Sequence, residues 1–232
     1  MSPNVGVSLT VLRALPVFEM LDDECLAPLG RAAMLRKIPR NTIILHAGDR
    51  TDNIYFVLTG LLKVQVSDEE GREVILSMLG PGELFGEMGV LDDHPRSATV
   101  LTVDQSDVVV MGKADFKQCL LENPDVSLFI MRNLTRRLRL ADRNIESLAL
   151  LDVYGRVARL LLEVAEVVDG RRIVTRKLSK QDIAKMVGAS REMVSRVMRD
   201  LMAQGFVQEQ DGQLILIDLA AFRRHGVVDT TN

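Results

Sequence analysis

The chain has 232 residues, of which 47 % are apolar, and a formal net charge of −3. This length suits two modest domains, each large enough to bury a core, and no apolar run reaches the length of a membrane span. The N-terminal stretch lacks the basic and apolar parts of a signal peptide. We therefore expect a soluble, cytoplasmic protein.

Cysteine and histidine usage excludes several kinds of site. Cys25 and Cys119 are expected to be buried or half-buried thiols. Neither they nor the scattered histidines, His46, His94 and His225, have the spacing of metal ligands. The sequence also lacks a Ser/His/Asp constellation, a Walker loop and paired catalytic carboxylates. It therefore predicts no metal or haem site and no enzyme.

The first half of the chain divides into a helical start and a region of short strands. Residues 9–35 carry leucines at helical spacing, interrupted by Pro16, and we expect helices there. From Pro39 on, β-branched segments alternate with glycines, a pattern typical of an antiparallel barrel or roll. The expected strands are Thr42–Leu45, Ile54–Leu58, Leu61–Val66, Val74–Met78, Ala98–Thr102 and Val108–Met111. The segment 68–71, Asp-Glu-Glu-Gly, suits a hairpin turn between two of them.

One segment of this region, Gly80–Ala98, is rich in glycine and proline. Backbone N–H groups around Gly86, with the cation of Arg96 and the hydroxyl of Ser97, would form a cradle for an anion. A carboxylate such as Glu87 beside a phosphate should instead accept a hydrogen bond from a sugar hydroxyl, so the combination indicates a nucleotide. The alternative is a glycine-rich corner of the barrel with a Glu–Arg pair on its surface.

A long helix is expected from Pro124 to about Ala149. Its apolar residues alternate in steps of three and four, which is typical of a coiled-coil seam. These residues are Met131, Leu134, Leu138, Ala141, Ile145 and Leu148. Packing against the chain's own barrel is the alternative, but the strict alternation favours a parallel homodimer.

A second helix is expected over Val153–Val167, ended by Asp169-Gly170 and followed by a strand over Arg171–Leu178. Its expected apolar face consists of Val157, Leu160, Leu161 and Val164. The stretch 178–207 then predicts two short helices joined by a turn at Gly188-Ala189. Since Ser190 is a suitable N-cap for the second helix, Arg191 and Glu192 fall in its first turn. This is the layout of a helix-turn-helix, whose second helix enters the DNA major groove.

A wing and the charge distribution extend this prediction. Segments Phe206–Gln210 and Gln213–Ile217 flank Asp211-Gly212, a type I′ hairpin signal. From Arg171 to Arg224 there are 11 lysines and arginines against 6 acidic residues, whereas the remainder has 18 against 26. The C-terminal part thus has a positive net charge and the remainder a negative one, which is typical of a protein with a DNA-binding module. A single helix-turn-helix also needs a dimer, because two recognition helices about 34 Å apart read a palindrome.

Together these elements resemble the cyclic AMP receptor protein/fumarate-nitrate regulator (CRP/FNR) family of bacterial transcription factors, from about Leu12 to Ile217. The motifs that carry the resemblance are Gly48-Asp49 to Tyr55 with Gly60, Phe85–Gly89 with Arg96-Ser97-Ala98, and Gly188–Glu192 with Val194 and Arg196. The resemblance implies an α+β fold with an N-terminal antiparallel β-roll of the cyclic-nucleotide-binding type, a long dimerisation helix and a C-terminal winged helix-turn-helix. It places the effector-binding roll and dimerisation helix in residues 1–150 and the DNA-binding domain in 151–232. The iron–sulfur sensors of the family are less similar, because only Cys25 lies near the N-terminus.

The resemblance implies a cyclic nucleotide as effector and assigns the second motif to it. Arg96 would pair with the cyclic phosphate, and Ser97 would add a hydroxyl donor. The backbone of Gly86 and Met88 would approach the sugar-phosphate. Glu87 would hold the ribose 2′-hydroxyl. No metal is implied.

The positions that would recognise the base depart from the family. A Thr-Ser pair of the best-known cyclic AMP-binding member is replaced here by Ala141 and Asp142. Ala141 cannot form a hydrogen bond through its side chain, and an ionised Asp142 only accepts, from an adenine amino group or from guanine N1–H and N2–H₂. The resemblance to the cyclic-AMP-type members makes cyclic AMP the leading ligand, but these two residues do not fix the base, so cyclic GMP and cyclic di-GMP are alternatives. A further alternative pairs Asp142 with Arg139 or Arg143 of the partner subunit and needs no nucleotide.

The third motif is assigned to double-stranded DNA. Arg191 and Arg196 would each contact a guanine bidentately, and Glu192 would accept from a cytosine amino group. These three residues match family members that read a TGTGA half-site, so the implied operator resembles TGTGA-N6-TCACA. The positions that match contacts to the DNA backbone are Lys180, Gln181 and Ser190.

The implied mechanism is allosteric, with the effector biasing the dimer and the winged helices rotating about a hinge near Leu151-Asp152. RNA polymerase is the expected further partner, and no membrane partner is expected. The loop Glu166–Arg172 is shorter than the polymerase-contacting loop of the best-known relative, so activation and repression both stay open. The competing function is a ligand-independent, constitutive DNA-binding protein.

Overall fold

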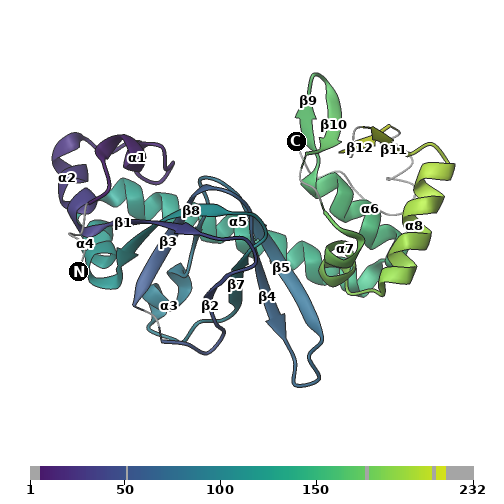
Figure 1. The fold of residues 1–232 in the computed structure, drawn as a ribbon, viewed down its shortest axis with the longest axis horizontal. Helices are drawn as coiled ribbons and strands as arrows, with labels where there is room; N and C mark the ends of the chain where they lie inside the picture. Colours follow the sequence, from purple (N-terminus) through teal and green to yellow (C-terminus); the bar gives the residue numbers. More distant parts are fainter. Residues whose placement is uncertain (1–5, 51, 176–177, 211–212, 218–232) are drawn as a thin grey trace. The chain divides into compact units, whose positions relative to one another are not determined.

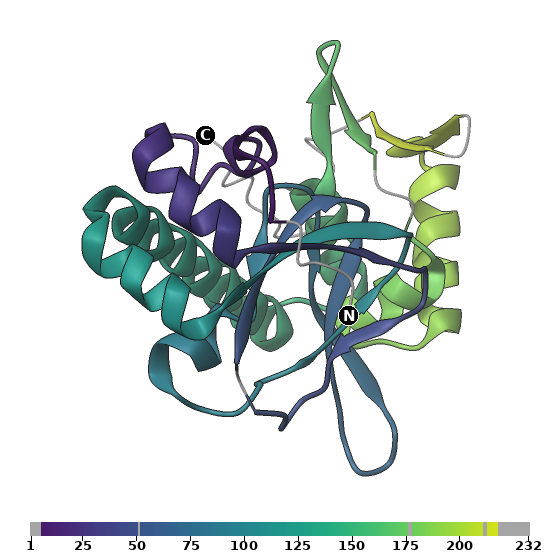
Figure 2. The same cartoon turned by 60° about the vertical axis from the view of Figure 1, so that its left-hand side comes forward.

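The computed structural model describes residues 6–50, 52–175, 178–210 and 213–217, drawn in Figures 1 and 2. The chain forms two compact units, Met1–Arg136 and Arg137–Asn232. Each unit has its own apolar core. One long helix, α5 (Pro124–Leu150), crosses the division between them and has nearly the bounds that the sequence predicts. The fold class is α+β, as expected.

The first unit contains two four-stranded antiparallel sheets. One has the strand order β1-β8-β3-β6 and the other β2-β7-β4-β5. The strands are β1 (Met34–Ile38), β2 (Ile43–Leu45), β3 (Asn53–Thr59), β4 (Leu62–Ser67), β5 (Glu73–Leu79), β6 (Leu84–Phe85), β7 (Thr99–Thr102) and β8 (Ser106–Gly112). The β4–β5 hairpin turns at the predicted segment 68–71, where the Asp68 carboxylate accepts from the backbone N–H groups of Glu70 and Arg72. These sheets form the expected antiparallel roll.

Both faces of β3 and β8, the central strands of the first sheet, are buried, which explains their almost continuous apolar sequences. In β3, Tyr55 and Val57 point into the core between the two sheets. The alternating residues Ile54 and Phe56 point to the opposite face and pack against helices. The ring of Phe56 lies 5.1 Å from that of Phe18. One side of the roll therefore carries the helical layer seen beside the sheets in Figure 2.

The helices of this unit are α1 (Leu9–Arg13), α2 (Asp23–Ala32), α3 (Glu87–Asp92) and α4 (Lys113–Glu122). The expectation of helix over residues 9–35 is wrong at its end, because Met34 and Leu35 belong to strand β1. That strand pairs with β8 from Met34 opposite Val110. The exposed Cys25 on α2 also contradicts the expectation that both thiols are covered, whereas Cys119 on α4 is buried.

The second unit begins within α5 and continues with α6 (Val153–Val164). The predicted apolar face of α6 is confirmed, since Val157, Leu160 and Leu161 are buried. The prediction that this helix reaches Val167 is wrong, because β9 (Glu166–Val168) pairs with β10 (Arg171–Val174) instead. Asp169 and Gly170 have φ values of 49° and 75°, so they form a tight turn between these strands.

In the described residues from 178 to 217, this unit continues with a helix pair and a strand pair. Helix α7 (Lys180–Val187) ends at Gly188, whose φ of 63° is left-handed, and α8 (Arg191–Ala203) follows. Strands β11 (Val207–Gln210) and β12 (Gln213–Leu216) complete a sheet of order β11-β12-β10-β9. The predicted turn at Asp211-Gly212 lies outside the described residues. This arrangement is the expected winged helix-turn-helix.

The predicted seam of α5 is largely exposed in the single chain. Met131, Leu138, Ile145 and Leu148 are exposed apolar residues. Only Leu134 packs against the core of the first unit, so packing against the chain's own roll accounts for one seam position. No helix within the described ranges is both long and apolar enough to cross a membrane.

Candidate functional site

The predicted anion-binding segment forms a tight loop between β6 and α3. Gly86 precedes α3 with φ 80° and ψ 5°, a left-handed conformation that favours glycine. A Cβ at this position would lie 2.5 Å from Nη1 of Arg96. Glycine is therefore required both for the backbone conformation and for the close approach of the arginine.

Arg96 is the central side chain of this loop and is only 6 % exposed. Its Nη1 donates to the Gly86 carbonyl and its Nη2 to the Asn53 carbonyl, each at 2.7 Å. The guanidinium lies over the ring of Tyr55, 5.9 Å from its centroid. Burial lowers the pKa of Arg96, but an arginine stays protonated at neutral pH. Its Nε is buried and has no hydrogen-bond partner among the described residues.

A buried N–H without an acceptor costs free energy, and such groups in native proteins usually have a partner. Arginine is well suited to phosphate, because its fork of N–H groups matches the phosphate oxygens. The orphaned Nε of Arg96 therefore fits an anionic group bound at this loop. The alternative interpretation of a surface Glu–Arg pair is wrong, because Glu87 and Arg96 are only 2 % and 6 % exposed.

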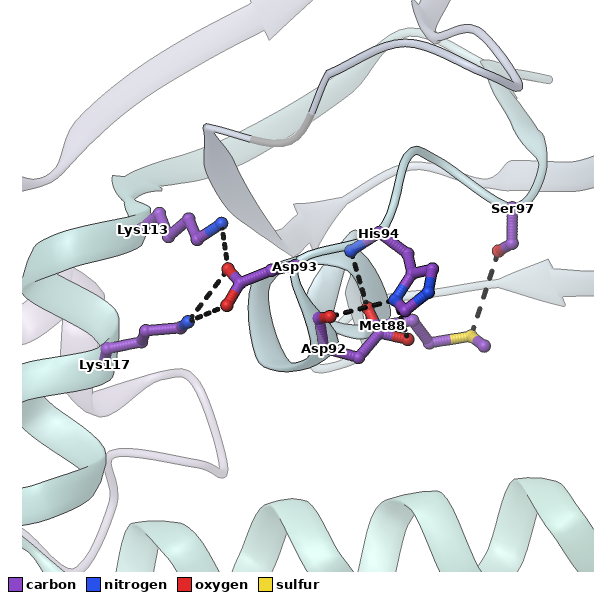
Figure 3. Close-up of polar contacts among 7 residues, drawn as sticks. All are labelled: Met88, Asp92, Asp93, His94, Ser97, Lys113 and Lys117. Carbon is purple, nitrogen blue, oxygen red and sulfur yellow. Dashed lines mark hydrogen bonds and ion pairs between the residues drawn. The ribbon is translucent and has the colours of Figure 1, made fainter.

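The other predicted effector residues fall into two groups. Glu87 starts α3, while Met88 and Ser97 are exposed beside it, and the Ser97 hydroxyl lies 3.9 Å from the Met88 sulfur (Figure 3). The structure thus brings these residues together around the Arg96 loop. The two base-recognition candidates, Ala141 and Asp142, are exposed on α5 in the second unit.

An ion-pair cluster that the sequence did not reveal lies between α3 and Arg96. Asp93 pairs with Lys113 and with Lys117 of α4, and its carboxylate oxygens lie 3.0 and 3.1 Å from the Lys117 Nζ (Figure 3). Hydrogen bonds from Lys113 and then Lys117 lower the pKa of Asp93. Asp93 also adopts a left-handed φ of 62° at the end of α3. The cluster therefore fixes the segment that leads from α3 to Arg96.

In the second unit, the start of α8 carries the predicted DNA-contacting residues. The Ser190 side chain caps α8 by accepting from the Met193 N–H at 3.2 Å. Arg191, Glu192 and Arg196 are exposed and line a surface hollow along α8. Hydrogen bonds from the backbone N–H of Glu192 itself and from the Ser190 hydroxyl, and the nearby charge of Arg191, lower the pKa of Glu192. The Glu192 carboxylate is thus kept ionised and able to accept hydrogen bonds.

The first turn of α7 carries the predicted contacts to the DNA backbone. Lys180 and Gln181 are both exposed there, directly after the N-cap residue Ser179. The Ser179 hydroxyl accepts from the Asp182 N–H at 3.0 Å, which fixes the start of the helix. Cationic and amide side chains at a helix start are typical of contacts to phosphates.

Two arginines of α6 fix the helix-turn-helix to the end of α5 within the same unit. Arg156 donates from Nε to the Val187 carbonyl at 2.8 Å and from Nη1 to the Leu151 carbonyl at 2.9 Å. Arg159, only 7 % exposed, donates from Nη1 to the Ser147 hydroxyl at 2.7 Å. The Arg156 bonds satisfy carbonyls at the end of α7 and directly after α5. The predicted hinge residues Leu151 and Asp152 therefore lie directly beside a hydrogen-bonded connection.

Comparisons with known proteins agree with both halves of this description. The family model of the cyclic nucleotide-binding domain matches residues 35–123, and that of the Crp-like helix-turn-helix domain matches residues 155–225. The cAMP-activated global transcriptional regulator CRP of Haemophilus influenzae is 35 % identical over 190 residues, which cover 79 % of this chain and 83 % of the relative. The chain belongs to the CRP/FNR family of transcriptional regulators.

Further CRP/FNR relatives match over most of their lengths. A CRP-like cAMP-activated global transcriptional regulator of Mycobacterium tuberculosis is 29 % identical over 212 residues, covering 90 % of this chain and 95 % of the relative. Among solved structures, the c-di-GMP responsive global regulator CLP of Xanthomonas campestris is 25 % identical with a TM-score of 0.69, covering 85 % of this chain and 100 % of that chain. The chain is thus a DNA-binding transcriptional regulator that contains a cyclic nucleotide-binding domain, and its relatives are regulators rather than enzymes.

Proposed function

We propose that this CRP/FNR regulator is a homodimer that reads a TGTGA-type palindrome under the control of a purine cyclic nucleotide, with cyclic AMP as the leading effector. Residues 1–150 serve as the effector-binding and dimerisation module and residues 151–232 as the DNA-binding module. The protein works in the cytoplasm, where its operator lies, and RNA polymerase is its proposed further partner.

The observation that carries effector control is the buried Arg96 with its unpartnered Nε. A bound cyclic nucleotide would supply the phosphate charge that this guanidinium lacks. Arg96 and the Ser97 hydroxyl donate to the phosphate, and the backbone of Gly86 and Met88 lies along the sugar-phosphate. Glu87 accepts from the ribose 2′-hydroxyl, a role that suits a carboxylate beside a phosphate site.

The identity of the base depends on Ala141 and Asp142. An ionised Asp142 accepts one hydrogen bond from the adenine amino group or two from guanine. Relatives of both kinds support the choice, since the Haemophilus protein is cAMP-activated and the Xanthomonas protein responds to c-di-GMP. Cyclic AMP leads because the chain is more similar to the cAMP-activated relatives, and cyclic GMP and cyclic di-GMP are the competing ligands.

DNA reading is assigned to the exposed side chains at the start of α8. Arg191 and Arg196 donate bidentately to guanine O6 and N7, and Glu192 accepts from a cytosine amino group. Lys180, Gln181 and Ser190 contact the phosphates and set the register. The implied operator is TGTGA-N6-TCACA.

Dimerisation is assigned to the exposed seam of α5. Exposed apolar residues at alternating steps of three and four are typical of a helix that packs against a second copy. The proposed interface consists of Met131, Leu134, Leu138, Ala141, Ile145 and Leu148. A dimer with two recognition helices about 34 Å apart would match the two half-sites of a palindrome.

A second candidate function is a constitutive, ligand-independent regulator. It is favoured by the two carbonyls that already accept from the terminal nitrogens of Arg96, because these bonds hold the loop without a ligand. In this case the apolar seam of α5 would hold the dimer in its DNA-binding conformation without a ligand.

One experiment separates the two functions. Gel shifts on the palindrome and on a scrambled duplex, with no nucleotide or with cyclic AMP, cyclic GMP or cyclic di-GMP, are combined with calorimetric titration of each nucleotide. We expect heat and tighter palindrome binding with one purine nucleotide, and loss of both in Arg96→Leu. Equally tight palindrome binding without nucleotide, and no heat with any of the three, would identify the constitutive regulator.

A further inference from the structure

The methionine in the first turn of α3 is exposed although its neighbours are not. Phe85, Glu87, Gly89 and Val90 are all buried, whereas Met88 is 51 % exposed. A large sulfur-containing side chain thus lies at the surface of the proposed effector loop. Oxidation of a methionine converts its apolar thioether into a polar group, so an exposed methionine at a binding site is open to chemical modification.

The sulfur of Met88 contacts a residue that is proposed to bind the phosphate. The Ser97 hydroxyl donates to this sulfur across 3.9 Å (Figure 3). Among the described residues, the sulfur is the acceptor of that hydroxyl. Because a thioether is a weak acceptor, a phosphate oxygen can take this hydrogen bond from it when the effector binds. In its reduced form Met88 therefore leaves the hydroxyl available to the ligand.

Oxidation by hydrogen peroxide changes the acceptor strength at this position. A lone pair of the sulfur forms the new S–O bond, the O–O bond of the peroxide breaks, and the second oxygen leaves as water with both protons. The sulfur is oxidised by two electrons and the peroxide is reduced by two. The product is a methionine sulfoxide, which methionine sulfoxide reductases convert back to the thioether.

A sulfoxide oxygen on the Ser97 side of the sulfur competes with the effector. The gap of 3.9 Å between the sulfur and the hydroxyl oxygen narrows toward the range of about 2.5–3.0 Å in which O–H···O bonds form. The partial negative charge of the sulfoxide oxygen also repels a phosphate beside it. Arg96 keeps its place because two backbone carbonyls hold it, but the ligand loses the Ser97 hydroxyl.

We propose that Met88 is a site of reversible oxidation at which peroxide weakens the binding of the effector. The proposal rests on the proposed function, since Ser97 must contact the phosphate for the oxidation to matter. It adds a second input to the same site, so that the oxidation state of one side chain sets how much nucleotide the regulator needs.

The test compares each protein with its own unoxidised form. Calorimetric titration with cyclic AMP, cyclic GMP and cyclic di-GMP gives the affinity before and after mild treatment with hydrogen peroxide, and mass spectrometry of peptides locates each sulfoxide. We expect the affinity of the wild type to fall about tenfold or more, the factor of one lost hydrogen bond to a charged group. Treatment with methionine sulfoxide reductase should restore it.

Four variants separate Met88 from the other oxidisable residues. Met88→Leu has an apolar side chain that peroxide does not oxidise, so its affinity should be the same before and after treatment, although Cys25 is still modified. Met20→Leu removes a methionine that is 81 % exposed and should show the wild-type fall. Ser97→Ala should show a smaller fall, because it lacks the hydroxyl that the sulfoxide withdraws. Met88→Gln, whose amide is a permanent acceptor, should bind as weakly as the oxidised wild type.

Several results would overturn the proposal and leave the effector assignment intact. These are an unchanged affinity once the Met88 sulfoxide is confirmed, an equal fall in Met88→Leu, and a Met88 that resists peroxide under conditions that oxidise Met20. An unoxidised wild type that gives no heat with any of the three nucleotides would contradict the effector assignment as well. Circular dichroism checks each fold, and Met88→Gln tests the proposal without peroxide, since wild-type affinity in that variant would contradict it.

Discussion

Arg96 donates a hydrogen bond of 2.7 Å to the carbonyl of Gly86, ten residues earlier in the chain. The contact is close because Gly86 has no side chain and a φ of 80°. The same arginine donates to Asn53 on β3, so one buried guanidinium joins the loop after β6 to a strand of the roll. The shape of the proposed effector loop therefore depends on the fit between these two residues.

Replacement of Gly86 tests this fit. Gly86→Ala introduces a Cβ that would lie 2.5 Å from the Arg96 Nη1 and also strains a left-handed backbone. We expect a loss of stability of about 1–3 kcal/mol and at least a tenfold loss of nucleotide affinity, because Arg96 must move. Urea unfolding and calorimetric titration give the two quantities.

The matched control is Gly71→Ala in the β4–β5 turn. Gly71 has a similar φ of 77° but nothing within 4 Å of the added Cβ. This variant should lose stability through backbone strain and keep its nucleotide affinity. If both variants lost affinity equally, the contact with Arg96 would not be what shapes the loop.

The elements that the sequence predicted correctly have strong periodic patterns. Helix α5 was found because its apolar steps run through more than two heptads, and α8 because Ser190 caps an apolar helical repeat. Strand β1 was missed because it is an edge strand, and its Met34 and Leu35 directly continue the apolar sequence of the preceding helical stretch. The valines of β9 were assigned to α6 because the Asp169-Gly170 turn can also end a helix.

For the proposed effector loop, the sequence predicted which residues take part but not how they are arranged in space. The residue types of the loop pointed to an anion, but Arg96 and its acceptor Asn53 are 43 residues apart. Asp93 and the lysine pair of α4 are likewise brought together by the packing of α3 and α4. Such long-range pairs follow no periodicity, so a single sequence contains no signal for them.

The ion-pair cluster at Asp93 predicts a difference between two substitutions. Asp93→Asn removes the charge but suits a left-handed backbone, whereas Asp93→Ala also introduces strain. We expect both to lower the melting temperature and Ala to lower it more. Added salt should reduce the effect of Asn, because exposed ion pairs are screened.

The pH dependence of this difference has a defined sign. The pKa of Asp93 is lowered in the folded state by Lys113 and Lys117, so its contribution to stability is present above the ordinary aspartate pKa of 3.8. It is lost as pH falls through the folded-state pKa. The wild type and Asp93→Asn should therefore differ most at neutral pH and converge in acid. A difference that grew in acid would contradict the cluster.

The bond between Arg159 and Ser147 predicts a coupled loss of stability in the second unit. Arg159→Met keeps the aliphatic packing but leaves the buried Ser147 hydroxyl without its donor, and we expect a cost of about 2–3 kcal/mol. Ser147→Ala removes only the acceptor and should cost about 1 kcal/mol.

The double variant should cost less than the sum of the two single variants, because the two residues share one interaction. Native-state hydrogen exchange of the α6 amides would locate the effect, and strict additivity would argue against the contact.

The two cysteines are predicted to differ in reactivity. The thiolate is the reactive form, and burial raises the pKa of Cys119 to about 11. Cys25 is exposed, and a hydrogen bond with Asp22 is the main cause of its raised pKa. At pH 8 iodoacetamide should therefore alkylate Cys25 in the native protein much faster than Cys119, whose thiol is buried. Asp22→Asn can still cap α2 and should speed the reaction of Cys25 alone.

Mass spectrometry of the tryptic peptides measures the alkylation rate of each cysteine. Urea-unfolded protein, in which both thiols react, is the control. Native Cys119 reacting as fast as Cys25 would show that α4 does not shield its thiol.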